Sequence, residues 1–258
     1  MSPAQVTRRP GAPDGLRVEK NGDVTTLALA RPECGNALSA GLVAALADAV
    51  QTCYRDGTRL LAFAGSGPHF CTGFDLGNLE SESDDSLLAR FIRVELLLQA
   101  VHAAPFTTVA LVRGRAVGAG ADLVAACEQR WMDRHSSIAF PGAGFGLVLG
   151  SARLAGLVGT ALAREWISGG AAIGADAAAA AGFAGLVAQQ DQPAALAALA
   201  ARTRRLDRSA HAAIQAATLQ GHGAIAQAQA SQLADLARSA ARPGLKARIV
   251  AYRASLKR

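Results

Sequence analysis

The chain of 258 residues has few aromatic and few charged residues, 5% and 18% of the total. It contains no run near the ~18 consecutive apolar residues of a membrane span, and residues 1–15 lack the apolar stretch of a signal peptide. Because 51% of the residues are hydrophobic, the composition excludes a disordered chain. It predicts a globular protein without membrane contact, packed largely through small side chains.

Cysteine is also scarce. The four cysteines lie far apart in the sequence, at Cys34, Cys53, Cys71 and Cys127, and no two of them form a CxxC motif. This spacing argues against zinc and dithiol motifs, so we expect no metal site. Reduced cysteines are usual inside the cell. Together with the missing signal peptide, they predict a cytoplasmic protein.

Positive charge is in excess, with 26 basic and 20 acidic residues and a formal net charge of +6. A basic protein suits polyanions such as nucleic acid, an anionic membrane or a phosphorylated small molecule. However, the Lys and Arg residues are scattered and form no basic stripe with interleaved aromatic residues. We therefore expect no nucleic-acid partner, which leaves the phosphorylated small molecule open.

The first half of the chain alternates strand and helix patterns. Asn21-Gly22 separates two alternating stretches, residues 16–20 and 24–30, and predicts a β-hairpin. Ser39 predicts the N-cap of a helix over residues 40–54. Further predicted elements are strands over 60–64, 107–112, 129–133, 137–140 and 186–187, a helix over 87–103, and a mobile surface segment over 79–86.

From Ser151 onward the pattern is almost wholly helical, and alanine-rich helices follow Gln192 with a break at Pro243-Gly244. This order places an α/β part before an all-α part. We therefore predict a flexible tail (residues 1–15), an α/β core (16–190) and a helical C-terminal region (191–258).

Two glycine-rich turns that follow strands are the main candidates for chemistry. GSGPHFCTGFDLGN follows strand 60–64, and RGRAVGAGAD follows strand 107–112. Neither turn is a phosphate-binding P-loop, since no GxxxxGK[ST] is present, and the dinucleotide motif GxGxxG is not intact. The chain also lacks the GxSxG motif of a serine nucleophile.

Oxyanion stabilisation fits these turns better. A turn of small residues that opens a helix leaves backbone N–H groups unpaired. Two such turns brought together form an oxyanion hole for a carbonyl that gains negative charge. Asp122, one turn into the second helix, would lie near that carbonyl. This combination suits proton transfer next to a thioester through an enolate.

Four motifs in order resemble those of one family: RPECGNALS, GSGPHFCTGFDL, PFTTVALVRGRAVGAGADLVAACEQR and ISGGAAIGADAAAAAGFAGLVA. This family is the enoyl-CoA hydratase/isomerase (crotonase) superfamily, and the resemblance covers nearly all of residues 16–252. This resemblance implies an α/β fold, a crotonase-like spiral of ββα units with a helical C-terminal trimerisation region. It also implies an acyl-CoA thioester substrate, with coenzyme A as part of the substrate and no tightly bound cofactor.

The resemblance also implies roles for residues at matching positions. The two oxyanion N–H groups fall on Phe74 and Ala119, and the first of two hydratase glutamates falls on Asp122. Where the second glutamate should stand, this chain has Gly142, which can neither donate nor accept a proton. Other carboxylates lie on a segment that borders the acyl pocket in the family: Glu80, Glu82, Asp84, Asp85 and Glu95.

Coenzyme A contacts are implied on two loops. The matching positions are Asn36, Ala37, Leu38, Thr72, Gly73, Asp75 and Leu76. Arg31 is a candidate partner for the phosphates of coenzyme A. Lys246 and Arg248 in the last helix are further candidates, acting from a neighbouring subunit.

Three functions are consistent with these features. The first is an acyl-CoA enzyme of the hydratase/isomerase type with Asp122 as acid and base, for which isomerisation suits one carboxylate better than hydration. The second is a crotonase-like acyl-CoA binder with changed or lost chemistry, such as a decarboxylase (a lyase) or a thioester hydrolase. The third, a structural or RNA-binding role, is disfavoured by the scattered basic charge. The alanine-rich helices predict a homotrimer or homohexamer.

Overall fold

The computed structural model describes residues 15–220 and 225–255. Its main sheet has the strand order β1-β2-β3-β4-β6-β9. β1 and β2 are antiparallel, and the other neighbouring strands are parallel. The strands are β1 (Leu16–Asn21), β2 (Val24–Leu29), β3 (Leu60–Gly65), β4 (Thr107–Val112), β6 (Gln129–Met132) and β9 (Gly185–Leu186).

A second, smaller sheet has the order β5-β7-β8. Its strands are β5 (Arg115–Val117), β7 (Ser137–Ala139) and β8 (Ile173–Gly174). The predicted strands at 129–133, 137–140 and 186–187 are confirmed as β6, β7 and β9 to within a residue at each end. The sequence did not predict β8, because two residues are too short to carry an alternating pattern.

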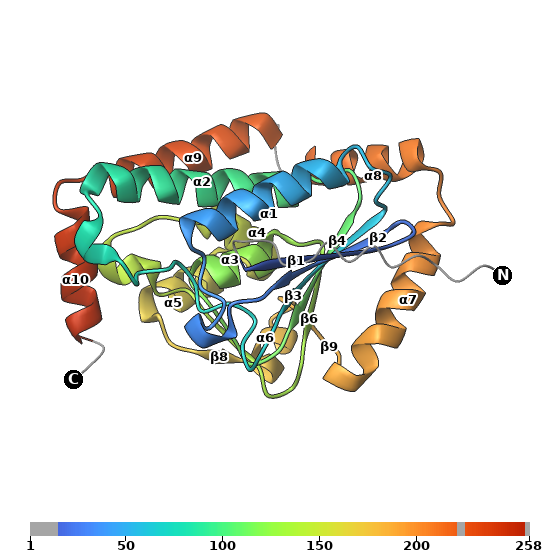
Figure 1. Cartoon of the computed structure of the whole chain (residues 1–258), viewed down its shortest axis with the longest axis horizontal. Helices are drawn as coiled ribbons and strands as arrows, with labels where there is room; N and C mark the ends of the chain where they lie inside the picture. Colours follow the sequence, from blue (N-terminus) through green and yellow to red (C-terminus); the bar gives the residue numbers. More distant parts are fainter. Residues whose placement is uncertain (1–14, 221–224, 256–258) are drawn as a thin grey trace.

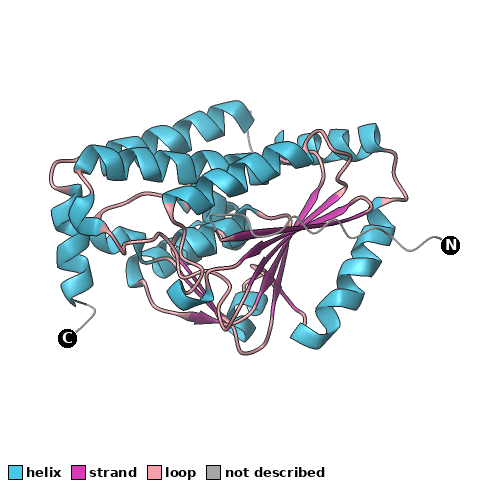
Figure 2. Cartoon of the chain, viewed as in Figure 1, coloured by secondary structure: helices cyan, strands magenta, loops and turns pink. Residues whose placement is uncertain are grey.

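Helices surround both sheets (Figures 1 and 2). They are α1 (Ala40–Cys53), α2 (Asp84–His102), α3 (Ala119–Ala126), α4 (Ser151–Val158), α5 (Thr160–Gly169), α6 (Ala175–Ala180), α7 (Gln192–Thr203), α8 (Arg208–Gln220), α9 (Ile225–Ala240) and α10 (Leu245–Ser255). Figure 1 shows α9 running alongside α2, and α10 beyond their common end. No helix in these described ranges is long and apolar enough to cross a membrane.

The central strands are buried on both faces. Leu61 and Phe63 of β3 belong to the largest apolar cluster, which includes α1, α2 and α3. Leu60 and Ala62 of the same strand contact Leu199 of α7 on the opposite face. Parallel strands covered on both sides carry continuous apolar runs. This explains why the apolar stretches at 60–64 and 107–112 predicted their strands correctly.

The hairpin and the first helix follow their local signals. Asn21 pairs with Val24 across the tight turn between β1 and β2. The Ser39 hydroxyl accepts a hydrogen bond from the Leu42 N–H at 3.1 Å and caps α1. Both predictions are confirmed, because a side chain–backbone bond three residues away and a two-residue turn depend only on neighbouring residues.

The predicted start of the second helix is wrong by three residues. α2 begins at Asp84 rather than at residue 87, because Ser83 and Ser86 exchange side chain–backbone hydrogen bonds in a capping box. A 3-10 helix at Leu79–Ser81 precedes it and buries Leu79. The segment at 79–86 thus contains helical turns that the sequence did not predict, and its mobility stays a prediction.

This segment also holds the last helix. The Asp84 carboxylate accepts hydrogen bonds of 2.8–3.1 Å from the N–H groups of Gly244, Leu245 and Lys246, at the start of α10. A carboxylate at a helix N-terminus satisfies unpaired N–H groups and interacts favourably with the helix dipole. The first turn of α2 thus fixes α10 beside the cavity described next.

Candidate active site

A cavity of about 390 Å³ lies where the two glycine-rich turns meet the start of α3 and the end of the chain. Its lining is mostly apolar. Among the residues that line it are Thr72, Gly73, Phe74, Leu76, Phe91, Arg115, Ala119, Asp122, Gly142, Phe145, Ser151, Tyr252 and Arg253. The cavity therefore contains all three residues predicted to be catalytic.

Gly73 allows the two turns to approach each other. Its φ is +99°, and a Cβ at this position would lie 2.6 Å from the Val117 carbonyl oxygen and 3.8 Å from the Ala119 nitrogen. Just before it, Cys71 exchanges backbone hydrogen bonds with Arg115 and Val117 at 3.1 and 2.9 Å. Any side chain at Gly73 would force the turns apart, so the close approach requires glycine.

Phe74 and Ala119 both line this cavity. The chain around Phe74 is held by bonds from Leu38 N–H to Gly73 O and from Asp75 N–H to Leu38 O. Within the described ranges, the Phe74 N–H itself donates to no acceptor. Ala119 is the first residue of α3, so its N–H has no carbonyl one turn earlier to bond. Two unpaired donors in one cavity have the form of an oxyanion hole.

The Phe74 ring is held against α2. It stacks on Phe91 with a centroid distance of 4.1 Å, and the Arg90 guanidinium lies 4.2 Å from its centroid. Arg90 also donates to the Asp75 carbonyl oxygen at 2.9 Å. A cation over a ring face is favourable, so the turn that carries the Phe74 N–H is anchored through its side chain.

Asp122 lies in the first turn of α3, with 4% of its surface exposed. Its Oδ1 is buried without a hydrogen-bond partner. Burial raises the pKa of Asp122 to about 8. The charge of Arg153 lowers this pKa, and the charge of Glu95 raises it. Since an unpaired carboxyl in an apolar site favours its neutral form, Asp122 is mostly protonated at pH 7.

Gly150 accommodates the Asp122 carboxyl. It has a φ of +66°, and a Cβ at this position would lie 2.0 Å from the Asp122 Oδ1. Gly150 is also the N-cap of α4. The first turn of α4 therefore packs directly against the carboxyl of Asp122, and only glycine leaves room for it.

The position of the expected second carboxylate is open. Gly142 lines the cavity, and a Cβ there would meet nothing closer than the Leu147 carbonyl oxygen at 3.7 Å. None of the other candidate carboxylates lines the cavity: Glu80, Glu82, Asp84, Asp85 and Glu95. Asp122 is the only carboxylate among the described residues of its lining.

The residues predicted to contact coenzyme A divide into two groups. Thr72, Gly73 and Leu76 line the cavity. The others do not line it: Arg31, Asn36, Ala37, Leu38 and Asp75. Their role in binding coenzyme A stays a prediction.

Asn36 and Arg31 hold the loops beneath the cavity together. The fully buried Asn36 amide donates to the carbonyls of Ser66 and His69, both at 2.8 Å. Its side-chain oxygen accepts from the Arg31 N–H at 2.9 Å. The Arg31 guanidinium pairs with Asp75 at 2.8 Å. Because these polar groups already have protein partners, they support the turn that carries Phe74.

The two basic candidates in the last helix also have partners within the chain. The Lys246 ammonium donates to the carbonyls of Glu80 and Glu82 at 2.7 and 2.8 Å. Arg248 donates to four backbone carbonyls, among them Phe145 at 3.0 Å and Ser239 at 3.1 Å. Both side chains therefore fix α10 to its own chain.

Sequence reasoning missed the residues that α10 and β5 bring to the cavity. The Tyr252 ring lies 5.5 Å from that of Phe145, and Arg253 donates to the Leu76 carbonyl oxygen at 3.1 Å. Arg115 is exposed at the cavity, and its guanidinium has no acceptor in the described ranges. Arg115 lies inside a quoted motif and could have been found there. Tyr252 and Arg253 reach the site only through folding.

This fold, with two unpaired N–H groups and one carboxyl in an apolar cavity, defines a protein of the crotonase class. Residues 19–242 match the model of the enoyl-CoA hydratase/isomerase family, so the chain belongs to that family. The predicted family and the crotonase-like α/β fold are thereby confirmed, whereas the role of the C-terminal helices in trimerisation stays a prediction.

Solved structures agree over nearly the whole chain. One from Bordetella parapertussis, assigned as an enoyl-CoA hydratase/isomerase, is 41% identical, covers 93% of this chain and 98% of its own, and has a TM-score of 0.89. One from Thermobifida fusca, assigned as an enoyl-CoA hydratase and solved in complex with acetoacetyl-CoA, is 28% identical. It covers 87% of this chain and 93% of its own, with a TM-score of 0.73.

The curated relatives match over a shorter length. A Mycobacterium tuberculosis protein named as an enoyl-CoA hydratase is 34% identical over 148 residues, which is 56% of this chain. The chain spans 58% of the length of that relative.

Proposed function

We propose that this protein is an acyl-CoA enzyme of the hydratase/isomerase type, and that Asp122 moves a proton next to the thioester. The observation that carries this proposal is the single buried carboxyl beside two unpaired N–H groups. The Thermobifida fusca structure with acetoacetyl-CoA supports coenzyme A esters as the substrate class. The exposed Arg115 is a further candidate partner for the phosphates of coenzyme A.

The proposed step is an isomerisation. The thioester oxygen accepts hydrogen bonds from the N–H groups of Phe74 and Ala119. Ionised Asp122 removes a proton from the carbon next to the carbonyl, and the C–H electron pair forms an enolate that these N–H groups stabilise. In a β,γ-unsaturated acyl-CoA this enolate is conjugated with the double bond, so Asp122 returns the proton to the γ-carbon and the double bond moves to the α,β position. A single carboxyl is sufficient for this cycle.

Gly142 favours a second candidate function. Water addition in this scheme needs one group to activate water and another to deliver a proton, and Gly142 supplies neither. The alternative is therefore an acyl-CoA binder with changed or lost chemistry, such as a decarboxylase or a thioester hydrolase. In either of these reactions the two N–H groups would still stabilise an oxyanion.

We also propose a homotrimer or homohexamer in the cytoplasm. The C-terminal helical region exposes large apolar side chains, Leu206 at 42% and Ile214 at 49%. Association would remove such surface from water. Light scattering at micromolar concentration tests the oligomer, and a monomer would contradict it.

A turnover screen over a panel of coenzyme A esters, with mass analysis of the products, tests the reaction. For the substrate found, Asp122→Asn should lower kcat by a factor of about 10² to 10⁴, the usual contribution of a positioned acid or base. Ester binding should change little, because most of the ester lies away from the carboxyl. The control is Asp48→Asn on the exposed surface of α1. Brisk hydration by the native protein, unchanged in Asp122→Asn, would show that another group is the acid or base.

A further inference from the structure

A buried ion pair lies behind the proposed catalytic carboxyl. Arg153 of α4 donates to both oxygens of Glu95 on α2, at 2.8 and 2.6 Å. Their side chains are only 2% and 1% exposed. Neither residue lines the cavity that contains Asp122, so the pair does not touch a ligand there.

Helix α4 links this ion pair to Asp122. Gly150, the N-cap of α4, packs against the Asp122 Oδ1, and Arg153 lies three residues further along the same turn. The charges of both Arg153 and Glu95 act on Asp122. The first turn of α4 thus carries both the glycine that contacts the Asp122 carboxyl and the buried arginine of the pair.

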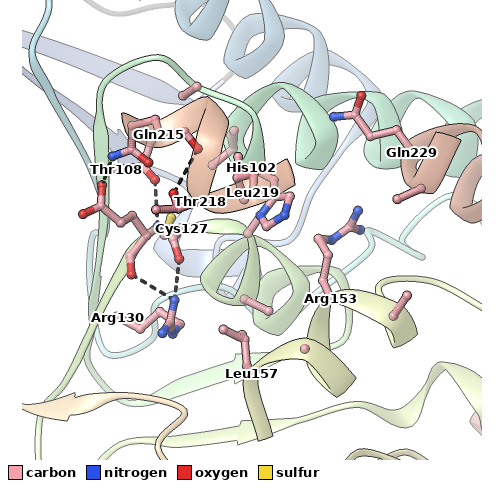
Figure 3. Close-up of a pocket in the computed structure, with 18 of the residues that line it drawn as sticks. His102, Thr108, Cys127, Arg130, Arg153, Leu157, Gln215, Thr218, Leu219 and Gln229 are labelled. Carbon is pink, nitrogen blue, oxygen red and sulfur yellow. Dashed lines mark hydrogen bonds between the residues drawn. The ribbon is translucent and has the colours of Figure 1, made fainter. Parts of the chain in front are cut away.

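The pair is held by side chains from several helices. Gln99 donates to the Glu95 carboxylate at 2.9 Å. Arg153 also donates to the side-chain oxygen of Gln232 on α9 at 2.8 Å. Figure 3 shows Arg153 and His102 on a second cavity of about 410 Å³, which Gln232 also lines. Gln232 can therefore be substituted to perturb the pair without changing a residue of the Asp122 cavity.

We infer that Glu95 and Arg153 are positioning residues that set the protonation of Asp122, with opposite signs. This inference rests on the proposed function of Asp122 as acid and base. The two charges act on Asp122 in opposite directions, and its burial has the largest effect, in favour of the neutral carboxyl. Loss of the positive partner should make ionisation harder, and loss of the negative partner should make it easier.

Other charged groups face the same region. Arg115 from β5, and Tyr252 and Arg253 from α10, line the Asp122 cavity on the side open to substrate. His102 on α2 lines the second cavity together with Arg153. Burial lowers the His102 pKa, and the Arg153 charge lowers it further. Both effects favour the neutral imidazole.

A role in packing alone would not require charges. A buried ion pair loses much of its attraction to the cost of desolvation, and apolar side chains of similar volume often fill such a site equally well. A buried pair of charges at this place is explained if Arg153 and Glu95 act electrostatically on the carboxyl of Asp122.

The test measures the Asp122 pKa directly, by infrared difference spectroscopy of the protonated carboxyl as a function of pH. Each protein is compared with the same protein carrying Asp122→Asn, so that only the Asp122 signal remains. Arg153→Met should raise the pKa, and Glu95→Gln should lower it, each by about one pH unit for charges nearby in a protein interior. The double variant Glu95→Gln/Arg153→Met should return it close to the native value.

A milder variant is needed if Arg153→Met or Glu95→Gln alone unfolds the protein. Gln232→Glu keeps the shape of a partner of Arg153 and adds a negative charge, so the Asp122 pKa should rise by about half a unit. Gln190→Glu, exposed after the edge strand β9, is the control and should leave it unchanged.

Shifts of the same sign in Arg153→Met and Glu95→Gln would overturn the inference, and so would no shift in Gln232→Glu. The spectra need no turnover. If the Asp122 pKa rises in Arg153→Met and falls in Glu95→Gln but the native protein converts no coenzyme A ester, the proposed function is contradicted. The effect of the ion pair on Asp122 would still be established.

Discussion

The buried carboxyl of Asp122 should make the native protein less stable as the pH rises. Its pKa is about 8 in the folded protein, against 3.8 for the ordinary group, chiefly because of burial. The folded state therefore binds one proton more than the unfolded state between these values. The contribution of Asp122 to the free energy of unfolding is greatest below about pH 4 and is lost as the pH rises towards 8.

Asp122→Asn isolates this effect, because the amide has nearly the same shape and does not titrate. One unit of pKa difference corresponds to about 1.4 kcal/mol. The free energy of unfolding of the variant should therefore rise relative to the native protein by about 1.4 kcal/mol per pH unit between pH 5 and pH 8. Across the whole window the gain is at most about 6 kcal/mol, with a plateau above pH 8.

The assay is urea unfolding followed by circular dichroism, at fixed protein concentration and at one-unit steps from pH 5 to pH 9. Asp207→Asn is the control. The pKa of the exposed Asp207 is lowered, mainly by a hydrogen bond from the Ser209 hydroxyl, so this carboxyl stays ionised above pH 5. Its stability difference from the native protein should be flat. A flat difference for Asp122→Asn as well would refute the reasoning that burial keeps this carboxyl neutral.

Three further substitutions follow from the site. Gly142→Glu should raise the hydration of crotonyl-CoA about tenfold or more, because an added acid or base is commonly worth at least that factor; no gain would show that the surrounding loop misplaces the carboxylate. Gly150→Ala should lower turnover at least about tenfold, since its Cβ would displace the Asp122 carboxyl. Gly22→Ala is the control, with a similar positive φ and no clash, and equal turnover losses in both would refute the explanation. Asp84→Ala should speed hydrogen exchange in the first turn of α10, whereas protection equal to the native protein would show that its hydrogen bonds are dispensable.

Much of the proposed catalytic centre could be predicted because its residues lie in local motifs. Phe74, Ala119 and Asp122 each follow a strand and a glycine-rich turn, and the structure brings all three to one cavity. The loop predicted to contact coenzyme A was harder to interpret, because an Asn in a motif can serve a ligand or the backbone equally well. Asn36 uses both ends of its amide on neighbouring loops, a choice that depends on what folds against it.

By itself, the sequence predicted the hairpin, the buried strands at 60–64 and 107–112, the Ser39-capped helix and the two glycine-rich turns, since each depends on residues a few positions apart. The missing carboxylate at Gly142 followed from the family resemblance. Only the tertiary structure placed Tyr252 over the cavity and paired Glu95 with Arg153. The first brings the last helix, α10, against Phe145 in the middle of the sequence, and the second joins α2 and α4 across a buried core. Such contacts form because packing buries apolar surface and forces buried charges to find partners. No periodicity in either helix records which partner that will be.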